Sequence, residues 1–223
     1  MAEYFGYDSS DITFAAEPTA REGVYSRRLK RAFDLLLVLL AAPIVLPVVM
    51  LLAFLVRRDG GPAFYRQDRI GKDGRIFRIW KLRSMVPDAE TLLAAHLDVH
   101  PEARAEWDRT QKLKDDPRIT RVGRLIRKTS LDELPQLWNV VAGDMSLVGP
   151  RPMLPAQATR YPGRAYYRLR PGLTGFWQIS SRNQSSFAER AGYDSRYAAK
   201  LSLLTDLRVL FATVRVVLRG TGY

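Results

Sequence analysis

The chain has 223 residues, 47% of them hydrophobic, with a formal net charge of +12 and no cysteine. Without cysteine it has no disulfide, no thiolate nucleophile and no Cys-ligated metal site. The hydrophobic residues are unevenly spread: residues 35–56 form a run of 22 without a charged or polar side chain, which excludes a wholly soluble protein, a multi-span carrier and a disordered chain.

The first 25 residues precede the apolar run, and we expect them to form a flexible leader. Residues 1–20 carry four acidic residues and neither Lys nor Arg, the reverse of a basic signal-peptide start. The basic excess begins after them, with a net charge of +9 over residues 21–83. Such charges beside an apolar segment are attracted to anionic head groups, by roughly 1 kcal/mol each. Membrane lipids are therefore an expected partner. Nucleic acid is not an expected partner, because the sequence contains no nucleic-acid-binding motif.

Two arrangements of the membrane segment are open from its residues. As a straight helix, the apolar run would extend about 33 Å and could cross a hydrocarbon core of about 30 Å. Pro43 and Pro47 favour a bend, because proline lacks an N–H group and clashes with the carbonyl group four residues earlier. Basic residues on both flanks favour a re-entrant hairpin with its two ends on one side, since cytoplasmic segments are rich in Lys and Arg.

The chain beyond the membrane segment is predicted to be mainly helical with one small β-hairpin. The hairpin covers Phe64–Ile70 and Arg75–Leu82, because an Asp-Gly turn signal separates two strand-like segments. One helix is expected over residues 87–108. Residues 203–218 are expected to form another, and two interpretations of it stay open: an amphipathic helix on the membrane surface or a part of the core.

Adjacent acidic residues, Asp132 and Glu133, are the strongest candidates for chemistry. One interpretation is structural, because Ser130 and Glu133 have the spacing of a helix capping box. The other is catalytic, because carboxylates can hold Mg²⁺ against phosphate oxygens and can attack phosphorus to form an acyl phosphate. Arginines just before the pair, Arg127 among them, would neutralise phosphate oxygens. The spacing alone leaves both interpretations open.

Several segments, taken in order, resemble the bacterial sugar transferases, which are monotopic phosphoglycosyl transferases that start lipid-linked glycan assembly. The resemblance covers residues 26–219, and within the family it is to the short form that initiates exopolysaccharide synthesis. The segments that carry it are residues 30–34, 81–85, 116–120, 130–136, 143–152 and 170–178.

The resemblance implies an enzyme that transfers hexose-1-phosphate from a UDP-hexose to undecaprenyl phosphate, with Mg²⁺ as cofactor, and releases UMP. It implies that Asp132 is the nucleophile, forming a phosphosugar-aspartyl intermediate, and that Glu133 helps to hold the metal. Which of the two acids binds Mg²⁺ is left open. It also implies that Arg127 and Arg151 bind phosphate and that Arg83 binds substrate.

The fold implied is α+β: a re-entrant helical hairpin at residues 26–58 and a cytoplasmic catalytic domain with membrane-surface helices at residues 59–223. The family breaks this helix at a Ser-Pro pair, and here Pro47 matches the proline while Leu46 replaces the serine. The expected location is the cytoplasmic face of the bacterial inner membrane.

Two rival functions remain: a single-span protein whose basic domain only binds lipid or a partner, and a glycosyltransferase that releases UDP. The sequence does not specify the sugar or the polysaccharide pathway. It also leaves the oligomeric state open, and a homo-oligomer is one of the alternatives.

Overall fold

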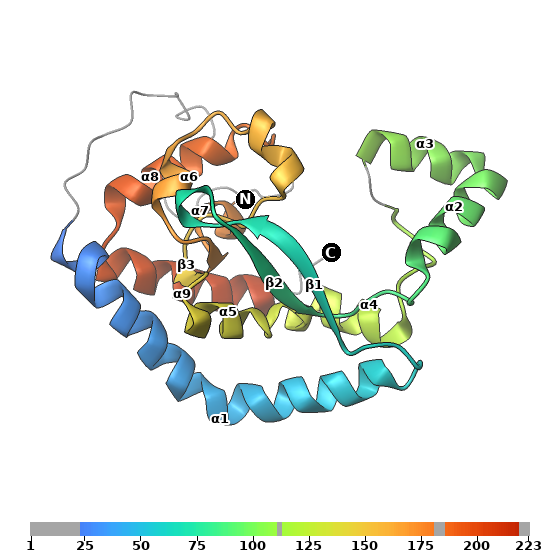
Figure 1. The fold of residues 1–223 in the computed structure, drawn as a ribbon, viewed down its shortest axis with the longest axis horizontal. Coiled ribbons are helices and arrows are strands. Elements are labelled where there is room, and N and C mark those ends of the chain that lie inside the picture. The colour runs from blue at the N-terminus through green and yellow to red at the C-terminus, as the bar shows by residue number, and fades with distance from the viewer. Residues whose placement is uncertain (1–22, 111–112, 181–185, 219–223) are drawn as a thin grey trace.

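The computed structural model describes residues 23–110, 113–180 and 186–218. Figure 1 shows a mainly helical domain beside one long helix. The helices are α1 (Lys30–Arg57), α2 (Ala89–Val99), α3 (Pro101–Thr110), α4 (Arg121–Lys128), α5 (Gln136–Ala142), α6 (Ala165–Arg168), α7 (Phe176–Ile179), α8 (Arg190–Lys200) and α9 (Leu203–Leu218). The strands are β1 (Phe64–Ile70), β2 (Ile76–Leu82), β3 (Ser146–Val148) and β4 (Gly172–Thr174). The expected leader lies, up to residue 22, outside the described residues.

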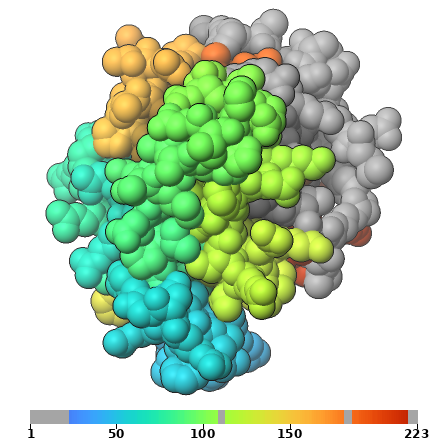
Figure 2. Space-filling view, turned by 90° about the vertical axis from the view of Figure 1, so that its right-hand side faces the viewer, coloured from blue at the N-terminus to red at the C-terminus, as the bar shows by residue number. Residues whose placement is uncertain are grey.

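The predicted β-hairpin is confirmed, with β1 and β2 antiparallel. The single helix expected over residues 87–108 is wrong, because the chain forms two helices that meet at His100. His100 is extended (φ −126°, ψ 91°), as expected for a residue whose helical conformation is disfavoured by the proline that follows. Figure 2 shows these two helices in green across one face of the molecule, with the end of α1 and the residues after it projecting below.

The core lies around β3, which pairs in parallel with β4. Val140 of α5, Val148 of β3 and Val209 of α9 are completely buried there. The hydroxyl group of Tyr197 in α8 donates a hydrogen bond to the Val148 carbonyl oxygen at 3.0 Å. Side chains from α5, α8 and α9 therefore converge on one short parallel sheet.

Asp206 of α9 connects this core to the start of the long helix. Its fully buried carboxylate accepts hydrogen bonds from Tyr25 at 2.6 Å, Lys30 at 2.7 Å and Tyr197 at 2.8 Å. The core interpretation of the last helix is met in part, since Val209 on one side of α9 is completely buried while Phe211 is 74% exposed. The membrane-surface interpretation stays a prediction.

The long helix α1 is the one described helix that is apolar and long enough to cross a membrane. Pro43 and Pro47 both lie inside it, and Figure 1 shows the helix bent in its middle along the lower edge of the domain. The bend expected at the prolines is present, and α1 continues through it as one unbroken helix. The re-entrant path through a membrane stays a prediction.

Both ends of α1 pack on the same domain. Near its start, Asp34 accepts a hydrogen bond of 2.6 Å from the Ser146 hydroxyl group in β3. Near its end, Val56 packs in a cluster with Leu82 of β2 and Ile126 of α4. The middle of the helix has no such cover, and its exposed side chains include Leu39, Leu40, Ile44, Leu46, Met50, Leu51 and Phe54.

Arg83 belongs to the second of these junctions. Its guanidinium group is buried and donates hydrogen bonds to the Asp59 carboxylate and to the carbonyl oxygens of Val56, Pro62 and Met85. Every nitrogen of the group is engaged in holding the end of α1 against the end of β2. The geometry thus places the expected substrate-binding arginine in a structural position.

We expect Arg83→Met to lower the free energy of unfolding by about 3 kcal/mol, because it removes a buried charged donor that several carbonyl oxygens share. Thermal unfolding of the purified protein measures this. The KM for the UDP-hexose that the family resemblance implies as donor should stay unchanged in the folded fraction. Asp59→Asn is the matched control, with a smaller loss of stability in the same direction. Normal stability with a raised KM in Arg83→Met would instead support the substrate-binding role.

Candidate active site

The acidic pair lies in a single 3₁₀ turn, Leu131–Glu133, between α4 and α5. Ser130 before it has a left-handed backbone (φ +57°, ψ 19°), and its side chain makes no capping hydrogen bond. The capping box is therefore not formed. A non-glycine residue in this conformation is strained by about 1–3 kcal/mol, which is typical of positions held for function.

Lys81 of β2 contacts both acids, and sequence analysis did not select it. Its Nζ atom lies 2.7 Å from Oε1 of Glu133 and 3.9 Å from Oδ2 of Asp132. The only sequence signal was its place at the head of the segment 81–85, from which Arg83 was chosen instead. Contact between residues so far apart in the chain depends on how β2 packs.

Asn139 of α5 determines that packing. It is 1% exposed, and its amide group donates to the Arg78 carbonyl oxygen at 2.8 Å and accepts from the Trp80 backbone N–H group at 3.0 Å. Both contacts fall on the strand just before Lys81. The buried amide therefore fixes the position of β2 along α5, which brings Lys81 to the acidic pair.

Burial raises the pKa of the Asp132 carboxyl group, whose side chain is 14% exposed. Lys81 and Arg127 lower it by charge attraction, while the neighbouring Glu133 raises it by repulsion. Arg127 approaches from α4. The nearby cations thus stabilise the charged form that burial disfavours, and the net pKa stays above that of an ordinary aspartate.

Arg151 reaches the pair from the loop after β3, with its Nη2 atom 3.7 Å from Oε1 of Glu133. Two further arginines hold this loop by its backbone. Arg190 of α8 donates to the Arg151 carbonyl oxygen at 2.7 Å, and Arg69 of β1 donates to the Pro152 carbonyl oxygen at 3.3 Å. The backbone position of Arg151 is therefore set from two directions.

Arg190 is itself held in a buried layer behind the loop. It is 6% exposed and interacts by charge with Asp194, whose pKa is raised to about 6 because the carboxyl group is buried. The hydroxyl group of Tyr161 donates to the Asp194 carboxylate at 2.6 Å. This layer touches the loop and not the acidic pair, so its members are positioning residues.

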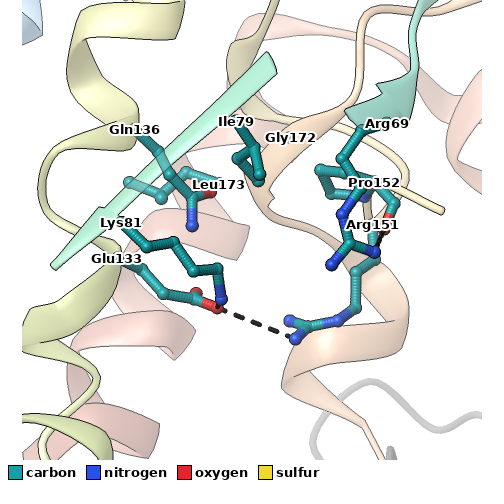
Figure 3. A pocket seen from close by; sticks show the side chains of 9 residues that line it. All are labelled: Arg69, Ile79, Lys81, Glu133, Gln136, Arg151, Pro152, Gly172 and Leu173. Atoms are coloured by element: carbon teal, nitrogen blue, oxygen red, sulfur yellow. Dashed lines mark hydrogen bonds and ion pairs between the residues drawn. The ribbon is translucent and has the colours of Figure 1, made fainter. Parts of the chain in front are cut away.

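A pocket of about 280 Å³, open solvent included, lies between Glu133 and this loop. In Figure 3, Lys81, Glu133 and Gln136 come from one side, and Arg69, Arg151 and Pro152 from the other. Three cationic side chains and one carboxylate line it, so it favours an anionic ligand. The complete lining is Arg69, Ile79, Lys81, Glu133, Gln136, Arg151, Pro152, Gly172 and Leu173.

The structure brings together four of the residues that the sequence proposed for chemistry: Asp132, Glu133, Arg127 and Arg151. It places Arg83 elsewhere, at the end of α1, and Pro43 and Pro47 lie inside the long apolar helix α1. It adds three pocket residues that sequence reasoning missed: Arg69, Lys81 and Gln136.

The acidic pair also provides the oxygen ligands that a magnesium ion needs. Within the described part of the chain, no three His, Asp or Glu side chains gather into a metal-binding group. Mg²⁺ commonly binds one or two carboxylates and takes its remaining ligands from water and substrate phosphates. Asp132 and Glu133 fit this pattern, and an all-protein cage is not needed.

Comparison with known proteins identifies the family of this chain. The sequence profile of the bacterial sugar transferases matches residues 25–220. A UDP-galactose-lipid carrier transferase of Erwinia amylovora is 52% identical over 199 residues, and an undecaprenyl-phosphate galactose phosphotransferase of Salmonella typhimurium is 49% identical over 199 residues. Each alignment covers 88% of this chain, which spans 42% of the length of either relative.

A relative of similar length is also known. An exopolysaccharide production protein of Rhizobium meliloti is 42% identical over 217 residues, an alignment that covers 96% of both chains. Together with the family match over almost all described residues, this likeness leads to one conclusion: the chain belongs to the bacterial sugar transferase family.

Proposed function

We propose that this chain transfers hexose-1-phosphate from a UDP-sugar to undecaprenyl phosphate and releases UMP, as the first membrane step of exopolysaccharide assembly. The names of the relatives support the reaction class and the lipid acceptor. The observation that carries the proposal is the recessed carboxylate of Asp132, which lies among the cations Lys81 and Arg127 beside an anion-binding pocket.

The reaction we propose has two displacements at one phosphorus atom. First, a carboxylate oxygen of Asp132 attacks the sugar-linked phosphorus, and UMP leaves with the electron pair of the broken bond to the bridging oxygen. An acyl phosphate carrying the sugar remains on Asp132. Second, an oxygen of the lipid phosphate attacks the same phosphorus, and Asp132 leaves as a free carboxylate.

Cationic side chains assist both displacements. Lys81, Arg127 and Arg151 would offset the negative charge on the phosphoryl oxygens as it shifts during each step. Glu133, with Asp132 beside it, would hold Mg²⁺, which neutralises charge on the donor diphosphate. Lys81 also favours the charged form of Asp132 by lowering its pKa, and only the carboxylate form can attack.

We propose further that α1 enters and leaves the same leaflet at the cytoplasmic face of the inner membrane. Both of its ends are bound to one domain, at Asp34 and at Val56, and its exposed apolar middle is bent. Apolar side chains are also exposed on other helices, among them Trp138 of α5 at 63% and Phe211 of α9 at 74%. These helices would lie on the membrane surface.

The nucleotide product tests the reaction. Full-length protein in detergent is incubated with Mg²⁺, a UDP-hexose and undecaprenyl phosphate, and the nucleotide is identified by chromatography. We expect UMP, and Asp132→Asn should reduce its formation by roughly three orders of magnitude or more. Release of UDP would instead support a glycosyltransferase. Absence of turnover in the wild-type protein would favour a lipid- or partner-binding role.

The pH dependence tests the part played by Lys81. Because Lys81 lowers the pKa of Asp132, Lys81→Met should raise that pKa, and the acidic limb of kcat/KM should move to higher pH. Arg78→Met is the control on the same strand, since its side chain is 70% exposed and pairs with Asp68. An acidic limb that does not move in Lys81→Met contradicts this role.

Cysteine labelling tests the path of α1, because the natural chain has no cysteine. Val24→Cys and Arg58→Cys flank the helix at exposed positions. A membrane-impermeant maleimide should label both in inverted vesicles and neither in intact spheroplasts. Ile44→Cys, in the exposed apolar middle, should react only after detergent is added. Labelling of Val24→Cys from outside the cell would establish a spanning helix.

A further inference from the structure

Gln136, the first residue of α5, has a buried amide group that no described residue satisfies. It is 2% exposed, and its Nε2 atom has no hydrogen-bond partner in the described part of the chain. The residue lines the pocket, and Figure 3 shows its amide nitrogen directed towards the space beside Lys81 and Glu133.

An unpaired buried donor of this kind is unfavourable, since it loses its water without gaining a partner. The adjacent core is apolar, and a methionine side chain of nearly equal length would fill the same position without that penalty. A glutamine retained there is therefore explained by a ligand that accepts its hydrogen bond.

A second unpaired donor belongs to Arg69, which lines the opposite wall of the same pocket. The Nε atom of Arg69 is buried without a hydrogen-bond partner, although the other nitrogens of that guanidinium group bind Gln67 and the Pro152 carbonyl oxygen. Burial lowers the pKa of Arg69, and the positive charge of Arg151 lowers it further. Two buried donors without partners thus belong to residues that line one small pocket.

The position of Gln136 relative to the acidic pair follows from helical spacing. It comes four residues after Asp132 and three after Glu133, and the linking residues Leu134 and Pro135 have helical backbone angles. Residues three and four apart share one side of a helical segment. Gln136 therefore lies on the same side of the turn as Glu133, and both residues line the pocket.

The chemistry of the lining specifies the acceptor. Lys81, Arg69 and Arg151 bring three positive charges against the one carboxylate of Glu133, so the ligand is an anion with several oxygen atoms. We propose that the Gln136 side-chain amide is a substrate-binding group that donates a hydrogen bond to a non-bridging phosphoryl oxygen of the donor diphosphate. This inference rests on the function proposed above and adds a neutral donor to its cationic site.

Gln136→Met tests the inference through binding and stability together. On full-length protein in detergent, isothermal titration with UMP and with inorganic pyrophosphate should show affinities roughly 10- to 100-fold weaker than wild type, because a hydrogen bond to a charged group is lost. The KM for the UDP-hexose should rise. The melting temperature of the ligand-free variant should equal or exceed that of wild type, because the unpaired amide is removed.

Gln178→Met is the matched control. Gln178 is 7% exposed, and both atoms of its amide group also lack partners among the described residues, but it does not line the pocket. Its replacement should affect stability in the same direction and leave both affinities unchanged. Gln136→Glu provides a second variant of the pocket residue, in which an acceptor replaces the donor, and it should bind pyrophosphate more weakly than Gln136→Met.

Wild-type affinity of Gln136→Met for pyrophosphate would overturn the inference, as would a loss confined to UMP, which would place the contact on the nucleoside. If Gln136→Met does not fold, unchanged pyrophosphate binding by Gln136→Glu overturns it equally. These titrations are separable from the test of the reaction: release of UDP by the wild-type enzyme refutes the proposed function, whereas UMP release with unaltered variant affinities refutes the role of Gln136 alone.

Discussion

Two adjacent carboxylates in a recessed turn impose the constraint on which the rest of the domain depends. Asp132 and Glu133 repel each other, and burial disfavours the charge of Asp132. Two charged carboxylates can be accommodated there only if nearby cations offset their charge. The side chains of Lys81, Arg127 and Arg151 provide these cations. Each cation comes from a different part of the chain, so β2, α4 and the loop after β3 must all converge on one turn.

Buried polar contacts, rather than apolar packing alone, hold that convergence in place. The Asn139 amide fixes β2 against α5, and Arg190 and Arg69 hold the backbone of the Arg151 loop. Such contacts are directional, so they specify a position along a strand or loop more sharply than a hydrophobic cluster does. A shift of β2 by one residue would remove Lys81 from the acidic pair.

The same domain also constrains the shape of the long apolar helix α1. Because α1 is tied down at Asp34 and again at Val56, its apolar middle can leave the protein surface only as an arch. Pro43 and Pro47 lower the cost of bending the helix, because proline has no N–H group to donate to the carbonyl oxygen four residues earlier. The shallow anchor that we propose would keep the pocket near the head groups, where the phosphate of the lipid acceptor lies. The local concentration of that acceptor at the pocket would then be raised.

Local patterns in the sequence were sufficient to predict the apolar segment with its bend and the β-hairpin. They also singled out the acidic pair and Arg127 as candidates. Runs, turn signals and neighbouring residues can be recognised in short stretches of chain. The sequence also pointed to Arg151 by resemblance. Only the tertiary structure placed Lys81, Arg69 and Gln136 in the pocket and Arg83 at the end of α1. Those assignments depend on which strand packs against which helix, and a contact between distant residues leaves no periodicity or spacing in the chain from which it could be read.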